Sequence, residues 1–240
     1  MNEKAFKIFV DFDGTITKQD VGELLVNTFG KSEQIKEIIR LWMEEKITSP
    51  ESWIQMLATM SNFSIAALEE MLKDITVDPF FNEFVLYCKN NNYQVRVLSD
   101  GFDIYINRIL RREGLLDLEV YSNKVTLDPD NMLIPSFPYG DEECKFCGNC
   151  KRNHLLVNSA DEDFIVYIGD GYSDKCPIQY CDFIFAKGSL LRFCEMNRIS
   201  YFPFEDFSNV ISRIDQLRRK RNLKKKHQAE LKRKEVFKQG

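Results

Sequence analysis

The stretch AFKIFVDFDGTIT, residues 5–17, decides the fold, because a short apolar run leads directly into two aspartates and a glycine. A continuous apolar run of this length is typical of a strand buried on both faces of a parallel sheet. The strand is expected over residues 5–10, and Gly14 allows a tight turn after it. Open α/β sheets bind ligands at the carboxyl ends of their strands, so Asp11 and Asp13 occupy a predicted ligand-binding position.

Strand and helix patterns alternate along most of the remaining chain. A helix is expected at residues 102–113, and further helices are expected between the later strands. Apolar, β-branched and aromatic residues indicate further strands at residues 93–99, 117–122, 163–170, 182–187 and 199–204. The alternation predicts an α/β fold with a mostly parallel sheet and helices on both faces.

Residues 20–75 have a different pattern, with apolar residues at helical spacing and no strand candidate. Four short helices are expected there, and Ser49-Pro50-Glu51 and Ser64 have the composition of helix starts. The sequence therefore predicts a chain of three parts. These are a core of residues 1–17 and 77–215, a helical insertion of residues 18–76, and a basic tail of residues 216–240.

Composition and charge exclude several classes of protein. The chain has 240 residues, of which 44% are hydrophobic and 29% charged, as in ordinary globular proteins. No apolar run reaches the roughly 20 residues that a membrane helix needs, and no secretory signal pattern is present. Seven cysteines, an odd number, favour reduced thiols and a cytoplasmic location. Monomer and homodimer both remain open.

Charge is unevenly distributed along the chain. Residues 218–240 contain 11 Lys/Arg and 2 Asp/Glu and so carry a net charge of +9, whereas residues 1–217 carry −13. An acidic body with a basic tail is not typical of nucleic-acid-binding domains, whose basic face belongs to the fold. We therefore expect neither a nucleic acid nor a membrane as partner.

Polar residues follow two later strands as they follow the first one. The strand at 93–99 ends with Ser99 in LSDG, and FIVYIGDGYSD ends with Asp170 and Asp174. The carboxyl ends of parallel strands meet at one edge of a sheet, so these side chains are expected to lie near Asp11. Asp and Ser are common after strands because they cap helices and form turns, and this would explain a single example. Polar residues at the ends of three strands together favour a functional site.

Clustered carboxylates without histidine are hard oxygen ligands that suit Mg²⁺ better than Zn²⁺. One carboxylate can attack phosphorus to form an aspartyl phosphate, and a second can protonate the leaving alcohol and later activate water. Phosphoryl transfer also requires positive charge around the phosphate oxygens. Lys151, in CKFCGNCKRNH (144–154), is the candidate, and we expect it at the start of a helix through NHLLVNSA.

The motifs DFDGTIT (11–17), SDG (99–101), GDGYSD (169–174) and the lysine between the last two together resemble the haloacid dehalogenase superfamily of aspartate-nucleophile phosphatases. Their order, with a helical segment between the first two motifs, is similar to that of the phosphoserine-phosphatase-like subgroup. Over about residues 1–215, the resemblance implies a Rossmann-like core with a small helical cap inserted after the first strand.

The resemblance also implies a role for each motif residue. Asp11 would be the nucleophile, and Asp13 the general acid and base. Asp174 would orient the lysine or a metal-bound water. The implied phosphate-binding residues are Ser99, Asp100, Gly101 and Lys151. The implied Mg²⁺ ligands are Asp11, Asp13 (through its backbone carbonyl) and Asp170.

Departures from the subgroup narrow the range of expected substrates. The first motif of phosphoserine phosphatases resembles DFDST, where this chain has DFDGT. Those enzymes also have a glutamate near the position of Asp20 and an asparagine at the position of Ser173, which argues against phosphoserine. The cysteine-rich approach to the lysine and FPFEDF (202–207) are closer to the methionine-salvage phosphatases that act on 2-hydroxy-3-keto-5-methylthiopentenyl-1-phosphate. The motif GDGYSDKCP and the cysteines before Lys151 also resemble the corresponding segments of phosphoethanolamine/phosphocholine phosphatases.

We therefore expect a Mg²⁺-dependent hydrolase of a small phosphorylated metabolite in methionine salvage. Phosphoethanolamine/phosphocholine and phosphoserine remain alternative substrates, and phosphoryl transfer to an alcohol other than water also remains open. A non-catalytic binding protein derived from a phosphatase is the alternative of another class. It would usually have lost Asp11, Asp13 or the lysine, and all three are present.

The cysteine-rich segment has two interpretations. Cys144, Cys147, Cys150 and His154 offer four ligands, enough for a closed tetrahedral zinc site. Three cysteines so close together leave little slack for a tetrahedron, and small residues packing a loop, or a redox-sensitive cluster, also fit. The sequence favours these alternatives over structural zinc.

One long helix is predicted for residues 206–238. Its first part is expected to dock on the core, because Val210, Ile211, Ile214 and Leu217 recur at helical spacing. Beyond Leu217 the apolar positions are too few for a buried stripe, so the rest is expected to be solvated or frayed. Truncation after Arg219 is accordingly expected to change activity by only a few-fold.

Overall fold

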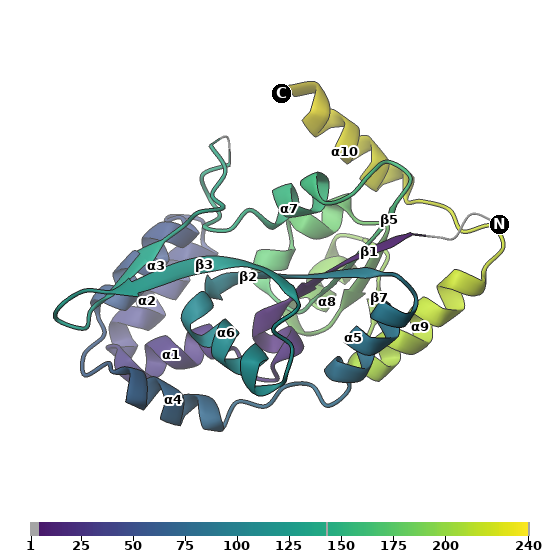
Figure 1. Ribbon diagram of the computed structural model, residues 1–240. Helices are drawn as coiled ribbons and strands as arrows, with labels where there is room; N and C mark the ends of the chain where they lie inside the picture. Colours follow the sequence, from purple (N-terminus) through teal and green to yellow (C-terminus); the bar gives the residue numbers. More distant parts are fainter. Residues whose placement is uncertain (1–4, 143, 240) are drawn as a thin grey trace. The chain divides into compact units, whose positions relative to one another are not determined.

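The computed structural model describes residues 5–142 and 144–239 (Figure 1). The chain divides into two compact units. The first consists of Met1–Ile16, Val77–Leu98 and Lys151–Gly240, and the second of Thr17–Thr76 and Ser99–Cys150. Across the described residues, the strands form a seven-stranded sheet in the order β4-β3-β2-β1-β5-β6-β7. The mostly parallel α/β fold is therefore confirmed.

The first unit is built on parallel strands in the order β2-β1-β5-β6-β7. Ile8, Phe9 and Val10 are fully buried, as expected for a strand with neighbours on both sides. In the register, Asp11 pairs with Leu98, and Val10 pairs with Ile168. The strands are β1 (Phe6–Asp11), β2 (Gln94–Phe102), β5 (Phe164–Gly169), β6 (Phe183–Ala186) and β7 (Phe202–Pro203).

Helices pack on both sides of these strands: in Figure 1, α5 and α9 lie on one side, and α7 and α10 on the other. The ring centroids of Phe81 and Phe207 are 4.9 Å apart, which joins α5 to α9. The helices are α5 (Phe81–Asn90), α7 (Lys151–Val157), α8 (Gly188–Met196), α9 (Phe207–Arg219) and α10 (His227–Gln239). The short turns are η1 (Phe12–Ile16), η2 (Tyr172–Asp174) and η3 (Pro177–Tyr180).

The second unit contains the four helices that the sequence predicts. Ser64 caps α4 as expected, whereas Thr48, one residue earlier than predicted, caps α3 in a capping box with Glu51. The helices are α1 (Val21–Phe29), α2 (Ser32–Met43), α3 (Ser49–Ala58) and α4 (Ile65–Lys73), followed by α6 (Asp103–Arg112). Arg112 donates to the carbonyls of Leu72 and Ile75, which ties α6 to the end of α4.

An antiparallel hairpin completes the second unit, and the sequence does not predict its second strand. Strand β3 (Glu119–Leu127) pairs with β4 (Leu133–Ser136). The strand predicted at 117–122 therefore begins later and runs further, because β4 supplies a partner for its second half. Residues 99–150, which the sequence assigns to the core, group with the helical insertion by their contacts. The predicted domain boundaries remain a prediction.

The prediction of one long C-terminal helix is wrong. Helix α9 ends at Arg219, and α10 begins only at His227. The first part docks as predicted, with Val210, Ile214 and Leu217 buried. The second part is also packed, since Ala229 and Arg233 are buried. Arg233 donates to the Tyr180 carbonyl at 2.6 Å and to Asp182 Oδ1 at 3.3 Å, so an ion pair, not an apolar stripe, docks α10.

Within residues 5–142 and 144–239, no helix has the length and apolar character required to cross a membrane.

Candidate active site

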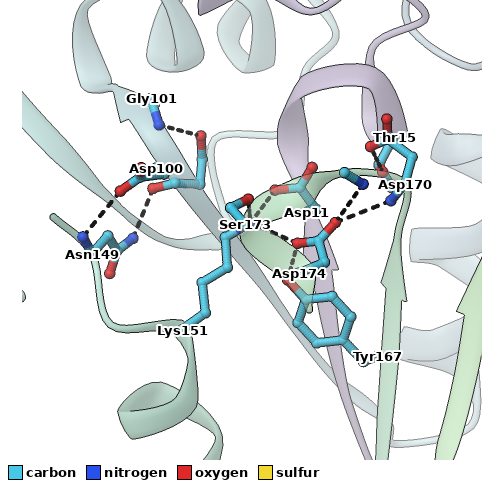
Figure 2. Close-up of polar contacts among 12 residues, drawn as sticks. Asp11, Thr15, Asp100, Gly101, Asn149, Lys151, Tyr167, Asp170, Ser173 and Asp174 are labelled. Atoms are coloured by element: carbon cyan, nitrogen blue, oxygen red, sulfur yellow. Dashed lines mark hydrogen bonds and ion pairs between the residues drawn. The ribbon is translucent and has the colours of Figure 1, made fainter. Parts of the chain in front are cut away.

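Asp11 is the last residue of β1 and is buried, with 5% of its surface exposed. Lys151 is the first residue of α7, as predicted, and its ammonium lies 2.5 Å from Asp11 Oδ1 (Figure 2). The structure thus joins two residues that are 140 positions apart in the sequence. The ion pair lies beyond the carboxyl end of a central strand, where the sequence predicts a ligand site.

The Lys151 ammonium has three N–H donors, and the structure supplies three acceptors. Besides Asp11, Nζ donates to Asp174 Oδ1 at 2.8 Å and to Ser173 Oγ at 2.9 Å. Both acceptors lie on η2, directly after β5. The lysine is therefore held between the ends of β1 and β5.

Asp174 is fully buried and accepts four hydrogen bonds. Its Oδ1 accepts from Lys151 and, at 2.6 Å, from the Tyr167 hydroxyl. Its Oδ2 accepts from the backbone N–H groups of Asp170 and Gly171, each at 3.0 Å. Asp174 thus fixes the backbone after β5 and the lysine at the same time.

Asp170 is half-buried and faces η1. Thr15 donates from Oγ1 to Asp170 Oδ1 at 2.7 Å. Gly14 has a φ of +73°, and a Cβ at this position would lie 2.5 Å from Asp170 Oδ2. Only glycine therefore allows the turn after Asp11 to approach this carboxylate so closely. Asp13 lies in the same turn, half-buried, with an extended backbone (φ −74°, ψ 124°).

Negative charge exceeds positive charge in this cluster. Asp11, Asp170 and Asp174 each bring a carboxylate oxygen within 4.8 Å of the others, and no other described residues form a comparable group of three potential metal ligands. Burial, followed by the charge of Asp174, raises the pKa of Asp11 well above its ordinary value, although Lys151 opposes this shift. Three carboxylates facing one ammonium are the arrangement that a divalent cation would neutralise, and carboxylate oxygens suit Mg²⁺.

Lys151 itself remains protonated. Burial lowers its pKa, but the charges of Asp11 and Asp174 and their hydrogen bonds outweigh burial and raise the pKa above its usual value. The ammonium is therefore a permanent positive charge at the end of β1, available to the oxygens of an anionic ligand.

The chain matches a family of phosphatases over most of its length. Residues 6–191 match the family model described as "Putative Phosphatase". The chain belongs to this phosphatase family. This family membership agrees with the motif resemblance to the haloacid dehalogenase phosphatases, a class of phosphomonoesterases that uses an aspartate nucleophile.

Known proteins similar to this phosphatase span nearly its whole length. Pdp3-interacting factor 1 of Schizosaccharomyces pombe is 28% identical over 226 residues, which cover 90% of this chain and 97% of that protein. The 2-hydroxy-3-keto-5-methylthiopentenyl-1-phosphate phosphatase of Bacillus mycoides is 28% identical over 218 residues, covering 89% and 97%.

Solved structures show the same fold. A phospho-aspartyl intermediate analogue of phosphoserine phosphatase superposes with a TM-score of 0.67 and 22% identity, covering 88% of this chain and 99% of that one. A haloacid dehalogenase family hydrolase from Salmonella enterica serovar Typhi gives a TM-score of 0.68 with 21% identity, covering 88% and 71%. At these identities the likeness concerns the fold alone.

In this phosphatase, the predicted phosphate-binding residues Ser99, Asp100 and Gly101 lie at the end of β2, in the second unit. Ser99 is fully buried, and its Oγ accepts from Gly101 N at 2.9 Å. The Asp100 carboxylate accepts from Asn149 N at 3.1 Å and from Ser49 Oγ. The Asp100 carboxylate is therefore held by the side chain of Ser49, which precedes it in the sequence, and by the backbone of Asn149, which follows it.

Asn149, in the cysteine-rich segment, was not predicted as a site residue. Its Nδ2 donates to the carbonyls of Ser99 at 2.7 Å and Tyr121 at 2.9 Å. The backbone of the segment is also engaged, because Phe146 O accepts from Ser49 N at 2.8 Å. Hydrogen bonds therefore connect this segment to its surroundings.

The structure does not support structural zinc. All three cysteines are described, as is His154, which is buried in α7, and none of them belongs to a group of three potential ligands within 4.8 Å. None of the three cysteines forms a disulfide with another described residue, and Cys150 is buried whereas Cys144 and Cys147 are partly exposed.

Three residues of the cluster were missed from the sequence. Thr15 and Ser173 lie inside the motifs DFDGTIT and GDGYSD, so their place in these motifs could have identified them as site residues. Tyr167 gave none, because an aromatic residue inside a buried strand is ordinarily a packing residue.

Proposed function

We propose that this phosphatase is a Mg²⁺-dependent hydrolase of a small phosphorylated metabolite, with Asp11 as the nucleophile. The observation that carries the proposal is the buried contact between Lys151 and Asp11 beside Asp170 and Asp174. It combines a carboxylate at a strand end with a permanent cation and further oxygen ligands, the components that phosphoryl transfer requires.

In the proposed first step, Asp11 attacks phosphorus through the oxygen that Lys151 does not bind, and the bond from phosphorus to the leaving oxygen breaks. Asp13 gives its proton to that oxygen. In the second step, Asp13 takes a proton from water as the water attacks the aspartyl phosphate, which releases phosphate and restores Asp11. Lys151 and Ser99 are the proposed partners of the phosphoryl oxygens.

Asp11, Asp170 and the backbone carbonyl of Asp13 are the proposed Mg²⁺ ligands. Asp174 is left to orient Lys151, because its two oxygens already accept four hydrogen bonds. Bound Mg²⁺ would neutralise charge on the phosphoryl group and on the carboxylates.

For the substrate, we propose 2-hydroxy-3-keto-5-methylthiopentenyl-1-phosphate or a chemically related ester. The name of the Bacillus mycoides relative supports this choice. Asp20 also supports it over phosphoserine, because Asp20 Oδ1 accepts from Glu23 N at 2.8 Å and caps α1 instead of standing free for a substrate ammonium. A cytoplasmic location belongs to the same proposal and is supported by seven cysteines, none of which forms a disulfide with another described residue.

The test is release of inorganic phosphate from p-nitrophenyl phosphate and from a panel containing the thiopentenyl ester, phosphoethanolamine, phosphocholine and phosphoserine. Activity should require Mg²⁺ and disappear with a chelator. Asp11→Asn should lower turnover by a factor of at least about 10³ while the fold remains intact. Asp117→Asn, in an exposed loop, is the matched control. Near-normal activity in Asp11→Asn would exclude the proposed nucleophile.

A further inference from the structure

Tyr167 lies in the middle of β5, and its side chain is fully buried. Its hydroxyl donates to Asp174 Oδ1 at 2.6 Å. A buried tyrosine hydroxyl needs a partner, but many acceptors would satisfy that need. Here the acceptor is the carboxylate oxygen that also binds the Lys151 ammonium, at 2.8 Å.

The two oxygens of Asp174 have different tasks. Oδ2 is held by the backbone N–H groups of Asp170 and Gly171. A carboxylate held at one oxygen can still rotate about the axis through that oxygen. The Tyr167 hydroxyl contacts the other oxygen from within the sheet and so fixes the plane of the carboxylate (Figure 2). The plane of the carboxylate in turn decides where Oδ1 meets the lysine.

The contact with Asp174 is one of three that hold Lys151 Nζ, and Asp174 is itself held by two backbone N–H groups. A phosphate group that binds at Asp11 would compete for the donors that point to Asp11 and Ser173. Asp174 is fully buried and is not a proposed ligand of the phosphate, so under the proposed function its bond to Lys151 would be retained when phosphate binds. Charge-assisted hydrogen bonds are short and directional, so a shift of Asp174 is transmitted to Nζ.

We propose that Tyr167 is a positioning residue for the phosphate-binding lysine: its hydroxyl fixes the Asp174 carboxylate and, through it, the Lys151 ammonium. The inference rests on the proposed function, in which Lys151 holds the phosphoryl oxygens. Tyr167 touches neither substrate nor metal, and it acts only through Asp174.

Tyr167→Phe removes the hydroxyl and preserves the ring. We expect the KM for p-nitrophenyl phosphate and the Kd for inorganic phosphate, measured by calorimetry with Mg²⁺, each to rise about tenfold, with a smaller change in kcat. Tyr201→Phe is the matched control, since that hydroxyl also donates to a carboxylate, Glu195 Oε1 at 2.9 Å, but on the surface. It should leave KM and Kd unchanged.

A purely structural role for Tyr167 predicts something different. The melting temperature and the fraction of active protein would fall, while KM and the phosphate Kd of the folded fraction would stay at the wild-type values, and this result would overturn the inference. Tyr167→Met supplies a second side chain without a hydroxyl, in case the phenylalanine variant does not fold. Both variants should shift Kd in the same direction.

A double-mutant cycle tests the route through Asp174. In an Asp174→Ala background, Tyr167→Phe should cause no further loss of phosphate affinity, whereas independent, multiplicative effects would overturn the inference. Phosphate binding can be measured without hydrolysis, so a wild-type chain that binds phosphate but hydrolyses no ester would refute the proposed reaction alone. A wild-type chain that binds phosphate no better than Lys151→Ala would remove the role of the lysine, and the inference with it.

Discussion

Arg233 attaches the basic tail to the first unit, and replacing it tests whether the tail belongs to the fold. The Arg233 side chain is 10% exposed, and the Asp182 side chain that it pairs with is fully buried. Arg233→Met keeps a long apolar stem and removes the charge. Asp182 would then keep the backbone N–H donors of Ile165 and Lys226, while the Tyr180 carbonyl would lose its guanidinium donor.

The expected loss follows from these contacts. Removing one partner of a buried ion pair typically costs about 3–5 kcal/mol. The N–O distance of 3.3 Å is long for a charge-assisted bond, and two backbone donors remain on Asp182, so the lower end applies. We expect Arg233→Met to lower the free energy of unfolding by about 3 kcal/mol, which for a chain of this size lowers Tm by about 6–12 °C.

Thermal and urea unfolding followed by circular dichroism measures this loss. Lys234→Met, at the exposed neighbouring position on α10, is the control and should stay within about 0.5 kcal/mol of the wild type. Truncation after Arg219, expected from the sequence to have little effect, should now destabilise the fold at least as much as Arg233→Met. If Arg233→Met has the same Tm and the same urea midpoint as the wild type, α10 is not docked and the ion pair contributes nothing to stability.

Further predictions concern the site and the cysteine-rich segment. Asp13→Asn should slow both formation and hydrolysis of the aspartyl phosphate in single-turnover measurements, because one carboxylate acts first as acid and then as base, and two unchanged rates would make it a structural residue. Lys151→Ala should raise the KM for phosphate esters at least about tenfold and lower kcat, and an unchanged KM would separate the lysine from the phosphate. Cys147→Ser should retain Mg²⁺-dependent activity within about twofold, whereas about one zinc per wild-type chain, lost in the variant, would restore the zinc interpretation.

The sequence predicts the strand-end aspartates well because the signals are local. Asp11 and Asp170 directly follow apolar runs, and parallel strands bring such positions to one edge of the sheet. The four helices of the second unit are predictable for a similar reason, since residues such as Ser64 satisfy backbone donors at the helix start regardless of the tertiary fold.

Features that depend on a distant partner could not be predicted in this way. Strand β4 is four residues long and contains Pro135, which a sequence pattern excludes from a strand although an edge strand tolerates it. Helix α10 lacks an apolar stripe, and its docking depends on a buried carboxylate about 50 residues away, Asp182. Asn149 carries no metal or catalytic signal, yet it binds the backbone of two strands.

The position of Lys151 explains why the cluster must contain so many carboxylates. A cation at the start of a helix is opposed by the helix dipole, and burial opposes its charge as well. The negative charges of Asp11 and Asp174 offset both effects. The two buried carboxylates in turn need the positive charge of the lysine, so neither the lysine nor the carboxylates would be stable there without the other. A cation bound by Asp11 and Asp170 would stabilise the folded state further, by mass action. Mg²⁺ should therefore raise the melting temperature of the wild type, and Asp170→Asn, which removes a proposed ligand while retaining the Lys151 contacts, should abolish that increase.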